Sequence, residues 1–194
     1  MTGLGFWRRP RTDESGIEVG GLVRTIGVAV GIPEPWGSQL DGHRAASGDP
    51  MASLIPAHLT LLGPTEVDAS ADATSKIESH LSATAADHRP FQLHLRGTGT
   101  FRPVTQVVFV AVAAGISDCE QLASDIRSGP LSRALNYPYH PHVTIAQDVP
   151  EASLDAAFDG LATFEARFPV DAFTLYEHID DGRWQPQRRF LLTG

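Results

Sequence analysis

The chain has 194 residues, 42% of them apolar and 20% charged, a composition typical of a folded globular protein with its own hydrophobic core. The formal net charge of −8 argues against a protein that coats nucleic acid through a broad basic face, but is compatible with a small groove for one phosphate or an RNA end. A single cysteine, Cys119, excludes an intrachain disulfide and a cysteine-rich zinc site, and there is no run of 18 apolar residues to span a membrane.

Hydrophobic patterning predicts strands and helices that alternate along the chain. Runs rich in β-branched residues, or with apolar and polar residues in alternation, predict strands, and apolar residues spaced three and four apart predict helices. The expected strands are 21–32, 58–63, 91–97, 106–114, 142–147, 168–179 and 188–192. The expected helices are 38–47, one with an apolar stripe from 73 to 85, one from 117 to the Gly-Pro at 129, and 154–161. The turn at 180–182 joins the last two strands as a hairpin.

Polar residues and Gly-Pro dipeptides mark where elements begin and end. Asp68 or Ser70 is the expected N-cap of the second helix. Ser117 is expected to cap the third helix, with Glu120 reaching back in a capping box. Gly63, which precedes a proline, is expected to close the second strand.

The order of elements predicts an α+β fold with loose two-fold symmetry. Each half has a strand that starts with H-x-T, followed by a helix and a strand pair, and no linker separates the halves. We expect one bilobal domain over residues 19–194 with two pseudo-symmetric sheet-plus-helix lobes. If the lobes pack about a pseudo-two-fold axis, the two H-x-T strands face each other across a central groove. Residues 1–18 have no apolar segment typical of a signal peptide and are expected to be a loosely ordered lead-in, so the predicted location is the cytoplasm.

The two H-x-T sequences carry the chemistry. They begin the apolar runs HLTLLG and HVTIAQ, and because side chains alternate in a strand, His58 shares a face with Thr60 and His142 with Thr144. Two imidazoles across a groove suit phosphodiester chemistry, since one takes a proton from the attacking oxygen and the other gives one to the leaving oxygen. An ordinary imidazole pKa near 6.5 lets one ring be neutral and one charged close to neutral pH. The threonine hydroxyls would orient the phosphate, and this scheme requires no metal.

These residues also carry a resemblance to a known family. PAHLTLLG and YHPHVTIAQ, with the strand VVFVAV between them, resemble the 2H phosphoesterase superfamily, and most closely its bacterial 2′-5′ RNA ligase and 2′,3′-cyclic phosphodiesterase branch. The resemblance covers roughly residues 20–192. It implies a bilobal fold, catalysis by His58 and His142, phosphate binding by Thr60 and Thr144, and no metal, cofactor or ATP. It also implies that His58 donates the proton and His142 accepts it.

Other residues near the second motif are open to more than one interpretation. Many RNA-ligase-like members have a basic residue three positions after the second threonine; here it is Gln147, which argues against a long RNA substrate and against ligation. Tyr139 could stack on a base or pack at the start of the strand. His140 shares the face of His142 by spacing, either in support of the site or as the start of the strand. Phe101 follows a turn and could line the groove, but a place in the core is favoured.

The sequence is compatible with three different functions. The first is a metal-independent phosphodiesterase that acts on 2′,3′-cyclic phosphate ends or 2′-5′ linkages, with ATP-independent ligation as its reverse. The second is a non-catalytic module that binds nucleotides or RNA ends, which would not need both histidines. The third is a metallohydrolase with His140 and His142 as ligands, although no acidic ligand cluster accompanies them. The favoured enzyme is expected to be a monomer whose partner is a nucleotide or RNA terminus.

Overall fold

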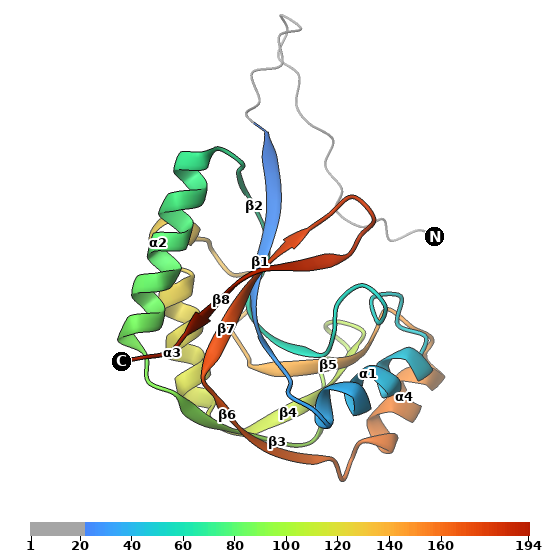
Figure 1. Ribbon diagram of the computed structural model, residues 1–194. Coiled ribbons are helices and arrows are strands. Elements are labelled where there is room, and N and C mark those ends of the chain that lie inside the picture. The colour runs from blue at the N-terminus through green and yellow to red at the C-terminus, as the bar shows by residue number, and fades with distance from the viewer. Residues whose placement is uncertain (1–21) are drawn as a thin grey trace, which may run out of the picture.

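The computed structural model describes residues 22–194, so the predicted lead-in over 1–18 and the boundary at residue 19 lie outside the described residues. Within that range the chain forms the predicted α+β fold, with one curled sheet and helices gathered at two sides of it (Figure 1). The strands are β1 Val23–Gly31, β2 His58–Asp68, β3 Phe91–Thr100, β4 Val107–Ala114, β5 His142–Gln147, β6 Glu165–Val170, β7 Ala172–His178 and β8 Trp184–Leu191. The helices are α1 Trp36–Ala46, α2 Ala71–Asp87, α3 Ile116–Ile126 and α4 Glu151–Gly160, with a short 3-10 turn, η1, at Gly129–Leu131.

The sheet is fully antiparallel, and its centre is made by the two H-x-T strands. The strand order is β6-β3-β4-β5-β2-β1-β7-β8, so β5 and β2 are neighbours with three strands outside each. The chain runs strand, helix, H-x-T strand, helix twice, as β1-α1-β2-α2 and then β4-α3-β5-α4. The two-fold arrangement expected from the sequence is therefore a property of the fold.

The two halves exchange helices. Helix α1, which precedes β2 in the chain, packs against β5, and α3, which precedes β5, packs against β2. The residue after each helix bonds to the strand it covers: the Ser47 hydroxyl donates to the Ile145 carbonyl at 3.3 Å, and Arg127 Nη1 donates to the Leu61 carbonyl at 2.9 Å. Each acceptor lies three residues after the histidine of its strand. No helix in the described part of the chain is long and apolar enough to cross a membrane.

The core lies under one face of the central strands and leaves the other face for the site. Leu59 and Val143, the middle residues of the two H-x-T sequences, are fully buried. His58 and Thr60 on either side of Leu59 are only half-buried, as the strand alternation predicts. The predicted apolar face of α3 is also confirmed, since Cys119, Leu122, Ala123 and Ile126 are all fully buried.

The predicted strand 168–179 is wrong in one respect, because it is two strands. Asp171 separates β6, which pairs with β3 at one edge of the sheet, from β7, which pairs with β1 near the other edge. One residue can join strands so far apart in the strand order only because the sheet curls back on itself, and Figure 1 shows β6 continuing directly into β7. A continuous apolar run cannot reveal that its two parts pair with different strands.

Two of the predicted boundaries also differ from the structure, and one is confirmed. Strand β2 continues past Gly63 to Asp68. Beyond Leu59 it pairs only with β1, so on the β5 side the proline after Gly63 has no partner strand to which its missing N–H would have to donate. Helix α3 starts without a Ser117 cap, because Gly115 has a φ of 89° and turns the chain into the helix two residues earlier. The cap of α2 is Ser70, whose hydroxyl accepts from the backbone N–H three residues on.

Candidate active site

A single backbone pair brings the two H-x-T sequences together. Leu59 in β2 is the Cα partner of Val143 in β5, and the two strands are antiparallel. Antiparallel pairing therefore sets His58 across from Thr144, and Thr60 across from His142. All four side chains project from the face opposite the core, and the two histidines are diagonal neighbours, a relation that typically puts Cα atoms about 7–8 Å apart.

Both imidazole rings are held by the same local contact. The Nδ1 of His58 lies 2.8 Å from the carbonyl of Pro56, and the Nδ1 of His142 lies 2.7 Å from the carbonyl of His140. A carbonyl can only accept, so in each ring Nδ1 carries the hydrogen, and Nε2 is left as the acceptor of the neutral imidazole. Two rings with identical tautomers on one face can each take up or release a proton at Nε2.

The surroundings make both rings harder to protonate than an ordinary imidazole. Burial lowers the pKa of His58 to about 4; the bond to the Pro56 carbonyl opposes this, and the charges of Arg44 and His142 add to it. Burial also lowers the pKa of His142, against the bond to the His140 carbonyl and with a small contribution from the His140 charge. The charge of His142 thus acts on His58, as expected for neighbours. Both rings are predominantly neutral near pH 7, so the ordinary pKa assumed from the sequence needs this correction.

Aromatic side chains account for the burial of His142. The ring of Phe101 lies edge-on to His142 with centroids 5.0 Å apart, and the ring of Phe109 lies 5.1 Å away. Phe109 is the β4 partner of Thr144, so it stands beside the site on the same face. Phe101 lines the groove rather than lying in the core, which corrects the expectation. Phe109 was missed because it lies within an apolar run that predicts only a buried strand.

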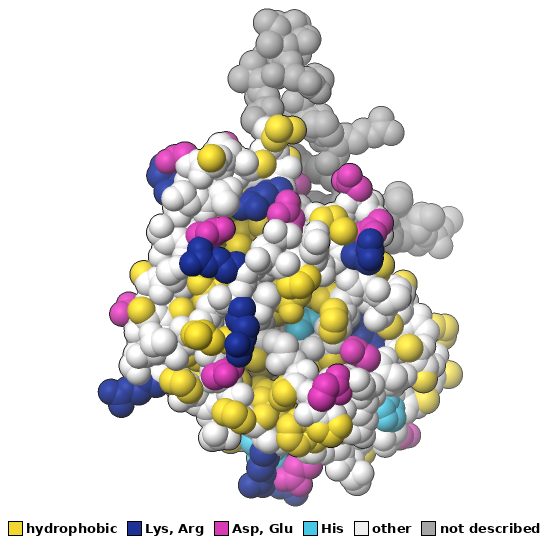
Figure 2. Space-filling model, in the orientation of Figure 1, with side chains coloured by type: hydrophobic (Ala, Val, Ile, Leu, Met, Phe, Trp, Pro, Cys, Tyr) yellow, Lys and Arg dark blue, Asp and Glu magenta, His cyan; other side chains and the backbone are white. Residues whose placement is uncertain are grey.

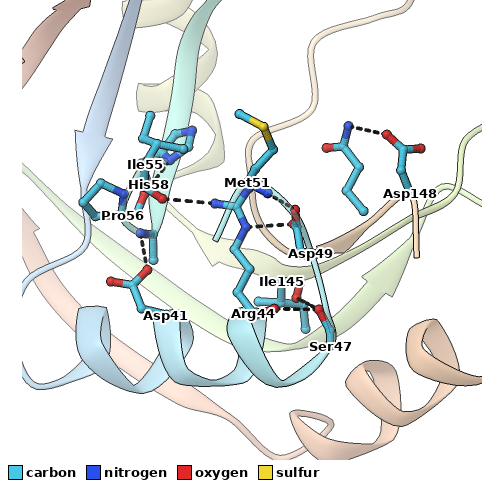
Figure 3. A network of polar contacts seen from close by, with 12 residues as sticks. Asp41, Arg44, Ser47, Asp49, Met51, Ile55, Pro56, His58, Ile145 and Asp148 are labelled. Carbon is cyan, nitrogen blue, oxygen red and sulfur yellow. Dashed lines mark hydrogen bonds and ion pairs between the residues drawn. The ribbon is translucent and has the colours of Figure 1, made fainter. Parts of the chain in front are cut away.

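A buried ion pair lies behind His58 (Figure 3). The Nε of Arg44 donates to Oδ2 of Asp49 at 2.8 Å, and both residues are only 4% exposed. Arg44 reaches up from α1, and its Nη1 also lies 3.4 Å from the carbonyl of Ile55. The backbone N–H of Ala57 donates to Asp41, another α1 residue, at 2.6 Å. Helix α1 thus holds the segment that leads into His58, and sequence patterning gave no sign of this network.

Three of the four H-x-T residues line an open groove of about 560 Å³. Thr60, His142 and Thr144 line it, whereas His58 lies beside them and outside its lining. Neither threonine hydroxyl hydrogen-bonds with any residue in 22–194, so both are available to a ligand. Beside His58 the β1 partner is Gly31, and a side chain there would meet nothing within 4 Å. The site therefore has space on both sides of the central pair.

The wall of the groove beyond Thr60 contains Tyr139 and two arginines. Tyr139 is half-buried; its hydroxyl donates to the Thr60 carbonyl at 2.9 Å, and the Arg127 guanidinium lies 4.5 Å from its ring centroid. These contacts give Tyr139 a packing role, and stacking on a base stays a prediction. Arg127 and Arg133 both line the groove and were not singled out from the sequence, because neither belongs to a motif.

The structure also shows the surroundings of Gln147 and His140, whose roles the sequence left open. The amide of Gln147 lines the groove and donates to the Asp148 carboxylate at 3.2 Å, so this position brings no positive charge. His140 is exposed, and its ring centroid lies 6.4 Å from that of His142. Over the described range there is no group of three or more His, Cys, Asp or Glu residues arranged to hold a metal ion, so the His140 and His142 pair has no third ligand.

Comparison with known proteins points to one family. The sequence model of the 2′-5′ RNA ligase superfamily matches residues 32–182, a span that includes both H-x-T strands. A Bacillus licheniformis protein named "Putative phosphoesterase" is 33% identical over 149 residues, which is 74% of this chain and 85% of the relative. An Oceanobacillus iheyensis protein of the same description is 30% identical over 146 residues, which is 74% of this chain and 84% of that relative.

Solved structures show the same fold. E. coli LigT in its apo form aligns with a TM-score of 0.63 at 24% identity, over 90% of this chain and 100% of that chain. At this identity the likeness speaks for the fold alone. Other crystal structures of E. coli LigT are complexes with 3′-AMP, ATP or NADP+.

Proposed function

The chain belongs to the 2′-5′ RNA ligase superfamily, and we propose that within it the protein is a metal-independent phosphodiesterase that opens 2′,3′-cyclic phosphate ends, or cleaves 2′-5′ linkages, of nucleotides and RNA. Membership supports phosphoesterase chemistry in general. The observation that carries the finer proposal is the matched pair of imidazoles, each anchored through Nδ1 to a carbonyl two residues back, on one face with two unbonded threonine hydroxyls.

In the proposed reaction, water attacks the phosphorus of the cyclic diester and one ribose oxygen leaves. One Nε2 takes a proton from the attacking water as the new P–O bond forms. The other imidazolium gives its proton to the ribose oxygen as the old P–O bond breaks, so the pair ends with its proton exchanged and no net change in charge. The hydroxyls of Thr60 and Thr144 donate to the non-bridging oxygens, where negative charge gathers in the transition state.

The electrostatics favour His142 as the proton donor and His58 as the acceptor. The loss of solvent around the ring and the Arg44 charge both disfavour a proton on His58, so we propose that the single proton of the active pair resides more readily on His142. This is the reverse of the assignment that the resemblance implies. The two assignments predict different results with a substrate whose leaving group needs no proton, because only the variant that lacks the proton donor should then keep most of its activity.

Two further observations support a nucleotide substrate. E. coli LigT has been crystallised in complex with 3′-AMP, ATP and NADP+, and we propose that the groove here also binds a nucleotide. The position after the second motif that is basic in many relatives is Gln147, bonded to an acidic neighbour, and this favours hydrolysis of small or end-positioned substrates over joining of RNA strands. We further propose that the protein works as a monomer in the cytoplasm, which sedimentation and localisation of a tagged chain would test.

The test of the proposed function is turnover in the presence of a chelator. Purified protein in EDTA is given 2′,3′-cyclic nucleotides, RNA ending in a cyclic phosphate, and a 2′-5′-linked dinucleotide, and products are separated by chromatography. We expect hydrolysis of at least one of them at a rate that EDTA leaves unchanged, and none in a variant with alanine at both His58 and His142. Tight nucleotide binding without turnover would instead favour the binding module, and loss of activity in EDTA would favour a metallohydrolase.

A further inference from the structure

We infer that Arg127 and Arg133 form a second phosphate subsite in the groove, which selects substrates that carry another phosphate besides the reacting one. The inference deepens the proposed function and rests on it for the identity of the reacting phosphate. The class of ligand is a nucleotide whose 5′ side bears a phosphate, either the next link of an oligonucleotide or a terminal 5′-phosphate.

Arg127 is placed beside the reaction centre. It follows the last residue of α3, and its Nη1 donates to the carbonyl of Leu61, one residue past Thr60. Its guanidinium lies over the ring of Tyr139, which in turn bonds to the Thr60 carbonyl. These contacts fix the position of the cation while using one of its three nitrogens. In the described residues, no acceptor faces its Nε or Nη2, so four of its five N–H donors remain for a ligand or water.

Arg133 stands further along the same wall. Its Nη1 lies 2.8 Å from the Pro64 carbonyl and 2.6 Å from the Thr65 hydroxyl, and the Gly63 carbonyl is 3.5 Å away. Its Nε and Nη2 likewise bond to nothing within residues 22–194. Gly63 is three residues past Thr60 along β2, so at about 3.3 Å per residue the second cation is anchored roughly 10 Å beyond the H-x-T threonine. A charge at that distance is beyond one phosphate group but within reach of a neighbouring one.

Among the arginines of residues 22–194, these two differ from most others in having no carboxylate partner in that range. Figure 2 shows basic side chains beside acidic ones on one face. The ion-paired arginines are Arg24, Arg44, Arg102, Arg167, Arg183, Arg188 and Arg189. Arg127 and Arg133 contact neutral carbonyl, hydroxyl and aromatic groups instead. Burial is the largest cause that lowers the pKa of Arg127, and the charge of Arg133 lowers it further, so the two cations are close to each other.

Two like charges held together in one groove, in a chain with a net charge of −8, disfavour the ligand-free state and favour a bound anion. They also explain how the groove can hold a polyanion although Gln147 supplies no charge. The positive charge of this groove comes from Arg127 and Arg133, in the segment that precedes the second motif, and not from position 147 at the end of β5. Both arginines bond to β2 residues that follow Thr60, so the two cations lie along the groove on the β2 side of the H-x-T pair.

Binding measurements test the subsite without requiring turnover. The affinities of adenosine 3′,5′-bisphosphate and of 3′-AMP are measured by calorimetry for the wild type, Arg133→Gln and Arg127→Gln/Arg133→Gln. Charge-assisted hydrogen bonds to the added 5′-phosphate should make the Kd of the wild type for the bisphosphate at least about tenfold lower than its Kd for 3′-AMP. Arg133→Gln should remove most of this difference and the double variant all of it. Arg96→Gln is the matched control, because Arg96 is exposed on β3 away from the groove lining, and it should keep the wild-type ratio.

Equal Kd values for the two ligands in the wild type, no detectable binding of the bisphosphate, or a ratio that survives in the double variant would overturn the inference. Arg133 is exposed, so its variant reports on binding even if Arg127→Gln disturbs the fold through the lost bond to β2. Failure here is separable from failure of the proposed function. Hydrolysis of cyclic phosphodiesters without a preference for the bisphosphate would support the proposed function and exclude the subsite. A preference for the bisphosphate without any hydrolysis would support the subsite and exclude the proposed function.

Discussion

Leu59 and Val143 are the pair through which the two halves of the sheet meet at the site, and each separates a histidine from a threonine. Both are fully buried, so the helices on the other face hold this pairing in place. As a consequence, His58 lies opposite Thr144 of the other half, and His142 lies opposite Thr60. The proposed acid, base and two hydroxyl donors are therefore positioned by backbone pairing and do not depend on long flexible loops.

Removing either histidine should abolish most of the turnover, and removing both should cost little more. His58→Ala and His142→Ala are each expected to lower kcat by about 10²–10⁴, because each deletes one proton transfer in the same transition state. The double variant should resemble the worse single variant, since the two groups act as a unit. Kinetics on a cyclic phosphodiester measure this, with His43→Ala, outside the groove lining, as control. A single variant with full activity would place catalysis elsewhere.

An activated leaving group should distinguish the two histidines. Bis(p-nitrophenyl) phosphate releases p-nitrophenolate, which leaves without help from a general acid. If His142 is the proton donor, His142→Ala should lose much less activity on this substrate than on a cyclic nucleotide. His58→Ala should lose a similar factor on both, because the attacking water still needs a base. The opposite pattern would restore the assignment implied by the family resemblance.

The threonine hydroxyls should matter for rate and hardly for stability. Thr60→Val and Thr144→Val keep the side-chain shape but remove one donor each, with an expected loss of at most about 10²–10³ in kcat. Neither hydroxyl bonds to another residue in the described part of the chain, so the melting temperature should barely change. Thr25→Val, on β1 well before the site, serves as the control and should retain wild-type kinetics. Unchanged rates in both site variants would show that the hydroxyls do not contact the phosphate.

The pH profile of kcat/KM should be bell-shaped with its maximum below pH 6.5. This parameter reports the unliganded enzyme, in which burial lowers the pKa of His58 to about 4 and lowers that of His142 as well. The profile of kcat should lie at higher pH, because a bound phosphate anion stabilises an imidazolium. Stability should fall from pH 6.5 towards 4, since the unfolded chain takes up a proton on His58 that the folded chain resists. A kcat/KM maximum above pH 7 would contradict this account.

Breaking the buried pair behind His58 should cost far more stability than breaking an exposed one. Arg44→Gln leaves the Asp49 carboxylate buried without its partner, with an expected loss of about 3–5 kcal/mol in the free energy of unfolding. Arg102→Gln, which removes an ion pair to the exposed Asp155, should cost about 0–1 kcal/mol. In Arg44→Met/Asp49→Asn, where no buried charge remains, NMR titration should show the pKa of His58 raised. An unchanged value would mean that the Arg44–Asp49 pair has no net electrostatic effect on the ring.

The sequence was most informative where the determining interactions are local. His58 and Thr60 must share a face if they lie in one strand, and that inference needs no tertiary information. The order of elements also sufficed for the fold class. What joins the two motifs is non-local: nothing in either strand indicates that Leu59 pairs with Val143. The expectation that the motifs meet came from the loose two-fold order of the elements and from the family resemblance, and not from the spacing of residues.

The residues that shape the groove were the ones that the sequence could not assign. Phe109 reads as one more apolar residue in a central strand, and only its pairing with Thr144 brings it to the site. Arg127 looks like an ordinary basic residue at a helix end, and Arg133 lies in an irregular segment with no periodicity. The low pKa of His58 likewise depends on Arg44 and on burial, both of which are set by how α1 packs.

The exchanged helices bear on how the molecule folds and how it can be divided. Helix α1 is connected to one half and buried by the other, and α3 is its counterpart, so a chain cut between β3 and β4 would leave each fragment with a strand face uncovered and a helix without its strand. Neither fragment alone could gain enough from burial to offset the entropy of ordering its backbone. The protein should therefore unfold in one cooperative step, and the two fragments should regain structure only when mixed. Because each half carries one histidine, we expect the proposed catalytic pair to be complete only when the whole chain has folded.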